Sequence, residues 1–263
     1  MIILVIFLGL LAFLILGIFR DIVVFLYLEA KSYLYPYFFP EKHVAFLEKN
    51  FVYYQKLPKK SKKIFLHKVA RFMSSKEFIP RQMTTVTDEM KVLISASAAQ
   101  LTFGFRGITF PYFYKIFVFP DKFYNRINNA YHKGEVNPRL KSIALSWKDF
   151  VEGYLQEDGR NLGLHEMAHV LRLENRILNE EHSFLEEWVL QEWALHAQRT
   201  MIEINDGRET FFRKYGGTDR EEFFAVAVEN FFERPVEFNQ KHPKTYRTLC
   251  RLLRQDPVLL EKA

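Results

Sequence analysis

The chain opens with an unbroken apolar run, because residues 2–19 carry no charged or strongly polar side chain. In a helix these residues would rise ~27 Å at ~1.5 Å each, which is close to the hydrocarbon thickness of a bilayer. A cleaved signal peptide is the alternative, but the run lacks a basic segment before it and a small-residue cleavage site after it. The pattern therefore predicts a transmembrane anchor over residues 1–20.

A second hydrophobic stretch follows the anchor and differs from it in being rich in aromatic residues. Residues 21–40 combine Phe, Tyr and Pro with scattered charges, as in a segment that lies at a membrane interface. The alternative is that these aromatic side chains pack on the folded domain. We interpret residues 21–40 as a juxtamembrane interfacial segment.

Beyond Pro40 the spacing of apolar residues predicts one folded domain over residues 41–263, with no internal repeat and no Gly/Ser linker. Helical periodicity and capping signals predict helices over 41–52, 61–74, 87–101, 161–174, 184–204, 221–232 and near 246–253. Alternating β-branched and aromatic residues predict strands over 114–119 and 142–147. The expected fold class is α+β, mostly helical with a small sheet before the helix at 161–174.

Charge along the chain predicts which side of a membrane the domain occupies. The formal net charge is +6, and between Arg20 and Arg71 eleven Lys and Arg residues stand against four Asp and Glu residues. The positive-inside bias predicts a single-pass protein of the cytoplasmic (inner) membrane whose domain faces the cytoplasm. The cluster at 59–63 is interpreted as either a solvated helix start or a contact with anionic head groups.

Composition excludes some classes of function. No nucleic-acid-binding signature accompanies the positive charge, so direct nucleic-acid binding is not expected. The single cysteine, Cys250, cannot form an internal disulfide, which suits a reducing compartment. Its Leu-rich surroundings predict that it is a small core residue.

The most informative motif is His165-Glu166-Met-Ala-His169, a His-Glu-x-x-His signature. In a helix, positions i and i+4 place both imidazoles on one face, at the spacing that binds one zinc ion. Glu166 then lies beside the open metal position, where it can take a proton from the attacking water. The alternative is a surface helix with two solvated histidines, which the apolar residues flanking the motif disfavour.

Two histidines leave zinc short of one protein ligand. A third histidine six residues after His169 is absent, because that position is Asn175. The acidic residues Glu186, Glu187 and Glu192 lie on a helix whose pattern is that of an exposed one. Glu222 and Glu229 are better candidates, since they stand two turns apart on an otherwise apolar helix and such carboxylates need a partner. The alternative is a pair of peripheral charges.

The two strands predicted before this helix suggest how a substrate would bind. A free sheet edge beside the metal allows an extended peptide to add as a further strand and places a scissile bond at the zinc. We expect the strand at 142–147 to be that edge.

Four blocks of the sequence resemble the zinc-dependent peptidases related to Mlc titration factor A, and the related catalytic domain of anthrax lethal factor. The blocks lie at 87–98, 145–153, 161–169 and 215–226, and the resemblance runs from about residue 51 to the C-terminus. It implies a zincin-like metallopeptidase domain with a base and an oxyanion-stabilising tyrosine. It implies that His165, His169 and Glu222 bind the zinc ion. It also implies that Glu166 is the base, that Tyr215 donates a hydrogen bond to the oxyanion, and that Glu229 contacts one of the metal-binding residues.

The chain departs from the family pattern in two places. Family members often carry an Asp three residues after the second histidine, where this chain has Arg172, and Glu174 is the expected substitute as an outer partner of the site. The anchor at 2–19 is absent from the soluble prototype, whose role is to bind a transcriptional repressor.

The function predicted from sequence is therefore a membrane-anchored zinc metallopeptidase with one zinc ion per chain and peptides or proteins as substrates. The alternative is a zinc-containing regulatory binding protein that sequesters a transcriptional regulator at the membrane. The presence of Glu166 favours the enzyme, because a structural zinc site has no use for that carboxylate.

Overall fold

The computed structural model describes residues 39–125, 129–177, 183–208 and 211–260, with 16–17, 19–20, 22–24, 26–28 and 30–31 near the N-terminus. Within these residues no helix combines the length and the apolar character needed to cross a bilayer. The predicted anchor at 2–19 lies outside the described residues except for Leu16, Gly17 and Phe19, which are exposed. In the predicted interfacial segment, Leu28 is buried whereas Tyr27 is exposed.

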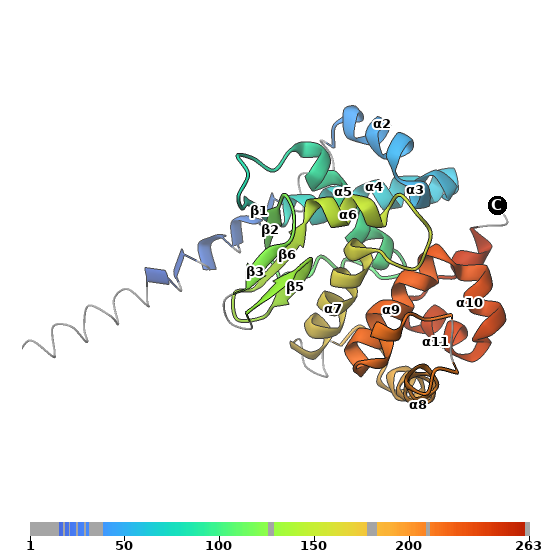
Figure 1. Ribbon diagram of the computed structural model, residues 1–263. Helices are drawn as coiled ribbons and strands as arrows, with labels where there is room; N and C mark the ends of the chain where they lie inside the picture. The colour runs from blue at the N-terminus through green and yellow to red at the C-terminus, as the bar shows by residue number, and fades with distance from the viewer. Residues whose placement is uncertain are drawn as a thin grey trace, which may run out of the picture.

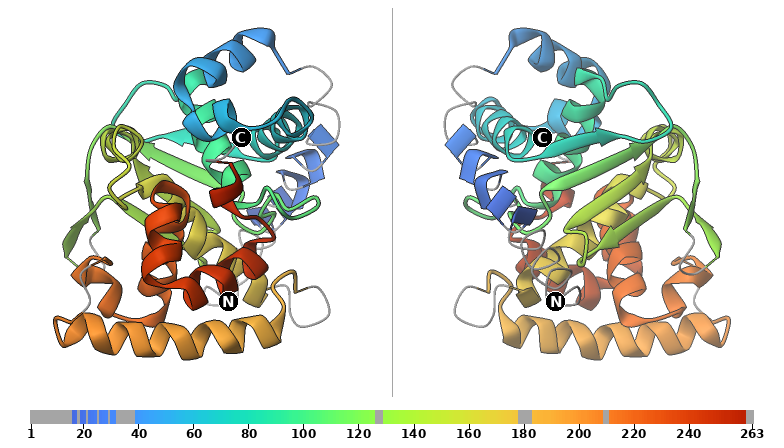
Figure 2. Two further views of the ribbon diagram at one scale, coloured as in Figure 1. Left: turned by 90° about the vertical axis from the view of Figure 1, so that its right-hand side faces the viewer. Right: turned by 90° about the vertical axis from the view of Figure 1, so that its left-hand side faces the viewer.

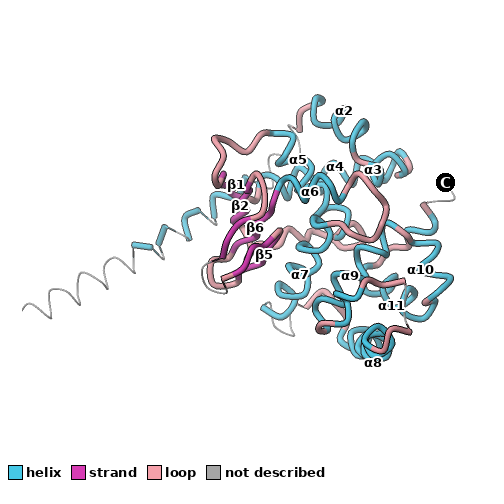
Figure 3. Tube along the Cα trace, in the orientation of Figure 1, coloured by secondary structure: helices cyan, strands magenta, loops and turns pink. Residues whose placement is uncertain are grey.

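A four-stranded mixed sheet lies beside the helices (Figures 1 and 3). Its order is β1 (Glu77–Pro80), β2 (Lys115–Phe119), β6 (Ser142–Ser146) and β5 (Gly134–Asn137). The first three strands are parallel, and β5 runs antiparallel to β6 with Gly134 opposite Leu145. A separate hairpin of β3 (Phe123–Asn125) and β4 (Ala130–His132) leads into β5.

The expectation that 142–147 forms the free edge is wrong. Strand β6 lies between β2 and β5, and all five of its residues are buried. Its apolar run is that of a strand covered on both faces, which is typical of a central position. The two edge strands are β1 and β5. β5 is a short strand with the sequence Gly-Glu-Val-Asn, and its polarity hid it from a search for hydrophobic alternation.

The predicted helices are confirmed, with small shifts at their ends. Thr87 caps its helix as expected, since its side chain accepts a hydrogen bond from the Met90 N–H. Three short helices were not predicted: the one that follows the helix at 41–50, the one that follows β6, and the one that precedes the final helix. The helices are α2 (Glu41–Asn50), α3 (Val52–Lys56), α4 (Lys59–Ser74), α5 (Asp88–Leu101), α6 (Trp147–Gly153), α7 (Leu162–Ile177), α8 (Glu187–Asn205), α9 (Arg220–Glu233), α10 (Pro235–Lys241) and α11 (Pro243–Leu253).

Helix α7 occupies the middle of the molecule. It packs against α5, against β5 and β6, and on its other side against α9, while α8 runs along the far end from the sheet (Figure 2). Buried phenylalanines from many elements fill the core, among them Phe65, Phe150 and Phe231. The abundance of Phe thus supplies core volume, and Cys250 packs at the margin of this core as a partly buried residue. The packing fixes α7 rigidly between the sheet and α9.

Candidate metal centre

The start of α7 is fixed by Asn161. Its Oδ1 accepts a hydrogen bond from the Leu164 N–H at 2.9 Å, which satisfies one of the free donors of the first turn. One turn later, His165 and His169 project from the same face, and their Nε2 atoms lie 3.1 Å apart. His165 is only 8% exposed, so the alternative of two solvated histidines is excluded for this ring.

Glu222 approaches the two histidines from α9, near the start of that helix. Asp219 caps α9 by accepting hydrogen bonds from the Glu221 and Glu222 N–H groups, which orients this first turn. Glu222 Oε2 lies 3.1 Å from His165 Nε2 and 3.6 Å from His169 Nε2. Ligands bound to a tetrahedral zinc at about 2.0–2.2 Å are themselves about 3.3–3.6 Å apart, so this triangle has the size of a zinc site.

A second observation also fits a metal. Glu222 Oε2 is buried, and the Nε2 atoms of His165 and His169 lie beside it. A buried carboxylate is costly unless positive charge beside it neutralises it, and a metal ion between these three residues would supply that charge. In the described part of the chain, His165, His169 and Glu222 each offer one potential metal-binding atom, and these three atoms all lie within 4.8 Å of one another. The three residues therefore suit a divalent cation with nitrogen and oxygen ligands.

Glu229 lies behind His165 and does not join this triangle. Its Oε1 contacts His165 Nδ1 in a short hydrogen bond, and it is fully buried. Arg213 holds Glu229 through both carboxylate oxygens, with contacts of 2.8 Å and 2.7 Å. A carboxylate on the distal nitrogen fixes the tautomer of a metal-binding histidine and leaves Nε2 free for the metal.

The carboxylates of Glu222 and Glu229 also shift the pKa of His165. Burial alone would lower the pKa of His165, but Glu222 and Glu229 outweigh it and raise the pKa to about 10. Burial raises the pKa of Glu222, yet His165 and His169 outweigh burial and hold it well below its usual range. The site therefore favours a positive charge between these residues, which a bound metal ion supplies.

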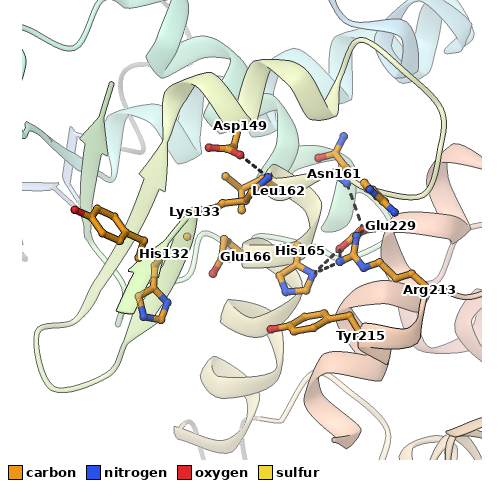
Figure 4. A pocket seen from close by; sticks show the side chains of 13 residues that line it. His132, Lys133, Asp149, Asn161, Leu162, His165, Glu166, Arg213, Tyr215 and Glu229 are labelled. Atoms are coloured by element: carbon orange, nitrogen blue, oxygen red, sulfur yellow. Dashed lines mark hydrogen bonds and ion pairs between the residues drawn. The ribbon is translucent and has the colours of Figure 1, made fainter. Parts of the chain in front are cut away.

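Glu166 projects from α7 toward β5 and is 5% exposed (Figure 4). Burial raises its pKa above the usual value for a glutamate, although His165 and His169 oppose the shift. A buried carboxylate with a raised pKa is suited to accept and then release a proton. The absence of a side chain on Gly134 makes room for it, because a Cβ there would come within 2.2 Å of Glu166 Oε1.

Tyr215 lies on the short 3₁₀ helix η3 (Lys214–Gly217) that precedes α9. Its ring centroid is 6.1 Å from that of His165, and half of its surface is exposed. Burial, with Glu222 nearby, raises the pKa of Tyr215 to about 12. The phenol is therefore protonated at neutral pH and available as a hydrogen-bond donor at the rim of the site (Figure 4).

Two hollows meet at the triad, one on each side of it. One, of about 430 Å³, extends toward Tyr131, Lys133 and Arg160, and the other, of about 400 Å³, extends toward Val136, Leu173 and Arg176. Both are lined by the same central set, which comprises His132, Gly134, His165, Glu166 and Tyr215. Through these shared residues the two hollows form a groove that passes His165 and Glu166.

Strand β5 forms one wall of this groove, and among the described residues it pairs with β6 alone. The Ser146 N–H donates to Lys133 O at 2.7 Å, which places Lys133 in a hydrogen-bonded pair with β6. In an antiparallel ladder the alternate residues point their main-chain groups the other way. Gly134 and Val136 therefore direct their N–H and C=O groups toward the groove.

Three residues that line or support the site were missed in the sequence: Gly134, Arg213 and Glu233. Glu233 accepts hydrogen bonds from the Gly159 and Arg160 N–H groups and from Asn161 Nδ2, and so holds the turn before α7. Its spacing from Glu229, one turn further along α9, was the available signal. Arg213 lies in a loop and has no periodic signal.

The expectation for Glu174 is wrong. It is fully buried on α7, and its Oε1 accepts a hydrogen bond from the Tyr112 N–H at 3.0 Å, away from the triad. Five positions after His169 a helix has turned well past the ligand face, so the side chain points into the core. Arg172 instead binds Glu221 at the surface, at 3.4 Å.

Comparison with known proteins agrees with this geometry. The sequence model of the glucose-regulated metallo-peptidase M90 family matches residues 28–254, which include every residue of the triad. The chain belongs to this family. The resemblance to the Mlc titration factor A family is thereby confirmed. The His-Glu-x-x-His motif on α7 thus lies within the part of the chain that matches a metallopeptidase family.

Several individual relatives cover most of the chain. An uncharacterized protein of Synechocystis sp. is 26% identical over 236 residues, which are 84% of this chain and 86% of the relative. Mlc titration factor A of Yersinia enterocolitica is 23% identical over 205 residues, which are 72% of this chain and 76% of the relative. The same figures hold for Mlc titration factor A of Yersinia pestis. This M90 chain therefore shares the greater part of its length with these proteins.

Proposed function

We propose that this M90 protein is a zinc-dependent peptidase that hydrolyses extended peptides, with one zinc ion held by His165, His169 and Glu222. The observation that carries the proposal is the triangle of ligand atoms with the buried Glu166 beside it. A structural zinc site is closed by four protein ligands, whereas this group offers three and borders an open groove.

When bound, zinc supplies a Lewis acid that polarises the scissile carbonyl and lowers the pKa of water. Glu166 removes a proton from the attacking water and then delivers it to the nitrogen of the leaving amine. Its raised pKa suits both transfers. Tyr215 donates its phenol hydrogen to the carbonyl oxygen as negative charge develops there.

The substrate main chain pairs with β5. Gly134 and Val136 offer alternating donors and acceptors along the groove, so an extended peptide adds as a fifth strand. Because Gly134 stands over Glu166, a peptide in this register carries its scissile bond past the base. The groove extends to both sides of Glu166, toward Tyr131 on one side and Arg176 on the other, which favours cleavage inside a chain.

The test is hydrolysis of a panel of unstructured peptides by the purified full-length protein, followed by mass spectrometry. Activity should vanish with a chelator and return with zinc. The matched control is Glu166→Gln, which should keep zinc and fold but lose about 10²–10⁴-fold in kcat. Cleavage that survives in Glu166→Gln would refute the assignment, and peptide binding without hydrolysis by the unmodified protein would favour the regulator-sequestering alternative.

We also propose that residues 2–19 hold the protein in the cytoplasmic membrane, with the M90 domain on the cytoplasmic side. The support is the uninterrupted apolar run and the excess of Lys and Arg between Arg20 and Arg71. A reporter fused after Ala263 should behave as cytoplasmic. A reporter active outside the cytoplasm, or a mature N-terminus beyond residue 20, would refute this placement.

A further inference from the structure

A third hollow lies away from the metal centre, between α4 and the loop at 103–109 that follows α5. Its volume is about 560 Å³, and it shares no described lining residue with the two hollows at the triad. Lys63, Ile64, His67, Lys68 and Arg71 line it from one face of α4, because their spacing follows the helical repeat. The opposite wall is the loop, which contributes Arg106.

The hollow concentrates positive charge. Four of its lining side chains are Lys or Arg, a fifth is His67, and none of its described lining residues is acidic. Lys68 donates to the carbonyl oxygens of Thr102 and Phe105, which are neutral and leave its charge uncompensated. Burial, together with Arg71, lowers the pKa of Lys68 to about 8, and burial with Arg71 and Lys68 lowers the pKa of His67. These groups repel one another, so an anion bound among them would be stabilised.

Apolar side chains stand among these cations. Ile64 is 54% exposed, and Phe103 and Ile108 line the same hollow. A small inorganic anion would leave this surface in contact with water. A ligand that carries both a phosphate and a hydrocarbon portion would cover it while pairing with the cations.

We infer that this hollow binds the head group of an anionic phospholipid, with the phosphate between Lys63, Lys68 and Arg106 and the first carbons of the lipid against Ile64. Arg and Lys supply the hydrogen-bond donors that phosphate oxygens accept. The site would dock the domain on an anionic membrane surface through α4. The inference is independent of peptide hydrolysis, because the hollow contains no residue of the metal centre.

The test is lysine footprinting of the full-length protein. Acetylation rates of Lys63 and Lys68 are measured by mass spectrometry with nanodiscs of phosphatidylcholine, with nanodiscs that also contain phosphatidylglycerol, and with glycerol 3-phosphate as a soluble phosphate ester. At about ten times the dissociation constant, the anionic nanodiscs should slow acetylation about tenfold. Neutral nanodiscs and glycerol 3-phosphate should have little effect.

Three variants make the result specific. Arg106→Glu should abolish the protection, and Ile64→Gln should weaken it, whereas Arg247→Glu, the same charge change at an exposed site on α11, should leave it intact. Equal protection by glycerol 3-phosphate would overturn the lipid assignment and show a site for a soluble phosphate ester. Protection that persists in Arg106→Glu, or no protection at all, would overturn the site itself. Neither readout depends on turnover, so failure here is distinct from failure of the proposed peptidase.

Discussion

Gly134 lies against the carboxylate of Glu166 across the wall of the groove, so a side chain on the glycine would displace that carboxylate. An added Cβ would approach Glu166 Oε1 to 2.2 Å and the carboxylate carbon to 2.4 Å. The space left by Gly134 on the edge strand therefore helps to set the position of the proposed base.

Gly134→Ala should reduce kcat while leaving the zinc content unchanged. The new methyl group forces Glu166 out of its position, but Glu166 is not a metal ligand in the proposed mechanism. Steady-state kinetics on a cleaved peptide and metal analysis of the same sample check this. Loss of zinc in Gly134→Ala would show that β5 supports the ligands rather than the base.

Glu222→Gln and Glu229→Gln should differ in their effect on zinc. Removing the charge of Glu222 removes a ligand and should abolish stoichiometric binding. Glu229→Gln leaves three ligands but loosens His165, so the affinity should fall by about 10–100-fold. Competition with a fluorescent chelator measures both values. Stronger loss in Glu229→Gln than in Glu222→Gln would reverse the assignment of ligand and supporting carboxylate.

Tyr215→Phe should lower kcat by about 10²–10³-fold without changing the zinc affinity. The phenylalanine keeps the ring beside His165 and Arg213 but removes the donor for the developing oxyanion. Kinetics with a peptide substrate decide the point, and the unfolding temperature serves as the control for folding. A rise in KM at unchanged kcat would instead assign Tyr215 to substrate binding.

The stability of the domain should depend on the ionisation of Glu233. Burial raises the pKa of Glu233 to about 8 despite hydrogen bonds from Asn161 and the Gly159 N–H, and the nearby Glu229 and Asp158 add to the increase. Between pH 4.5 and about 8, Glu233 is therefore protonated in the folded state but ionised in the unfolded state. The free energy of unfolding should fall as the pH rises through that window.

Glu233→Gln removes the titrating group and should flatten this dependence. Denaturant unfolding of the zinc-saturated protein and of the variant, at several pH values in this window, gives the slope of the free energy of unfolding against pH for each. The contributions of all other titrating groups cancel in the difference between the two slopes. Identical slopes would show that Glu233 is already ionised throughout, held by its three donors.

The chemistry of the site could be predicted from the sequence because it lies on helices. His165, Glu166 and His169 follow from the helical repeat alone, and Glu222 follows from a carboxylate placed on an apolar helix. Helical periodicity is local, so a short stretch of sequence fixes which side chains share a face. Glu222 and Glu229 were both recognised in this way, although the choice between them needed the family resemblance.

The walls of the groove could not be predicted because they depend on contacts between distant segments. Strand β5 has four residues and no hydrophobic alternation, and only pairing with β6 defines it as a strand. Arg213 belongs to a loop and acquires its role by reaching Glu229. Glu174 shows the opposite error, in which closeness to the motif along the chain was taken for closeness in space.

The edge position of β5 would also limit which proteins the proposed peptidase can cleave. A segment pairs with Gly134 and Val136 only if its own main-chain groups are unbonded, and in folded proteins most of those groups are already engaged in secondary structure. The rate of cleavage should therefore follow the local opening equilibrium of the target. Such a peptidase would distinguish disordered segments from folded ones, in addition to recognising side chains. It would cleave frayed termini and damaged chains in preference to intact proteins.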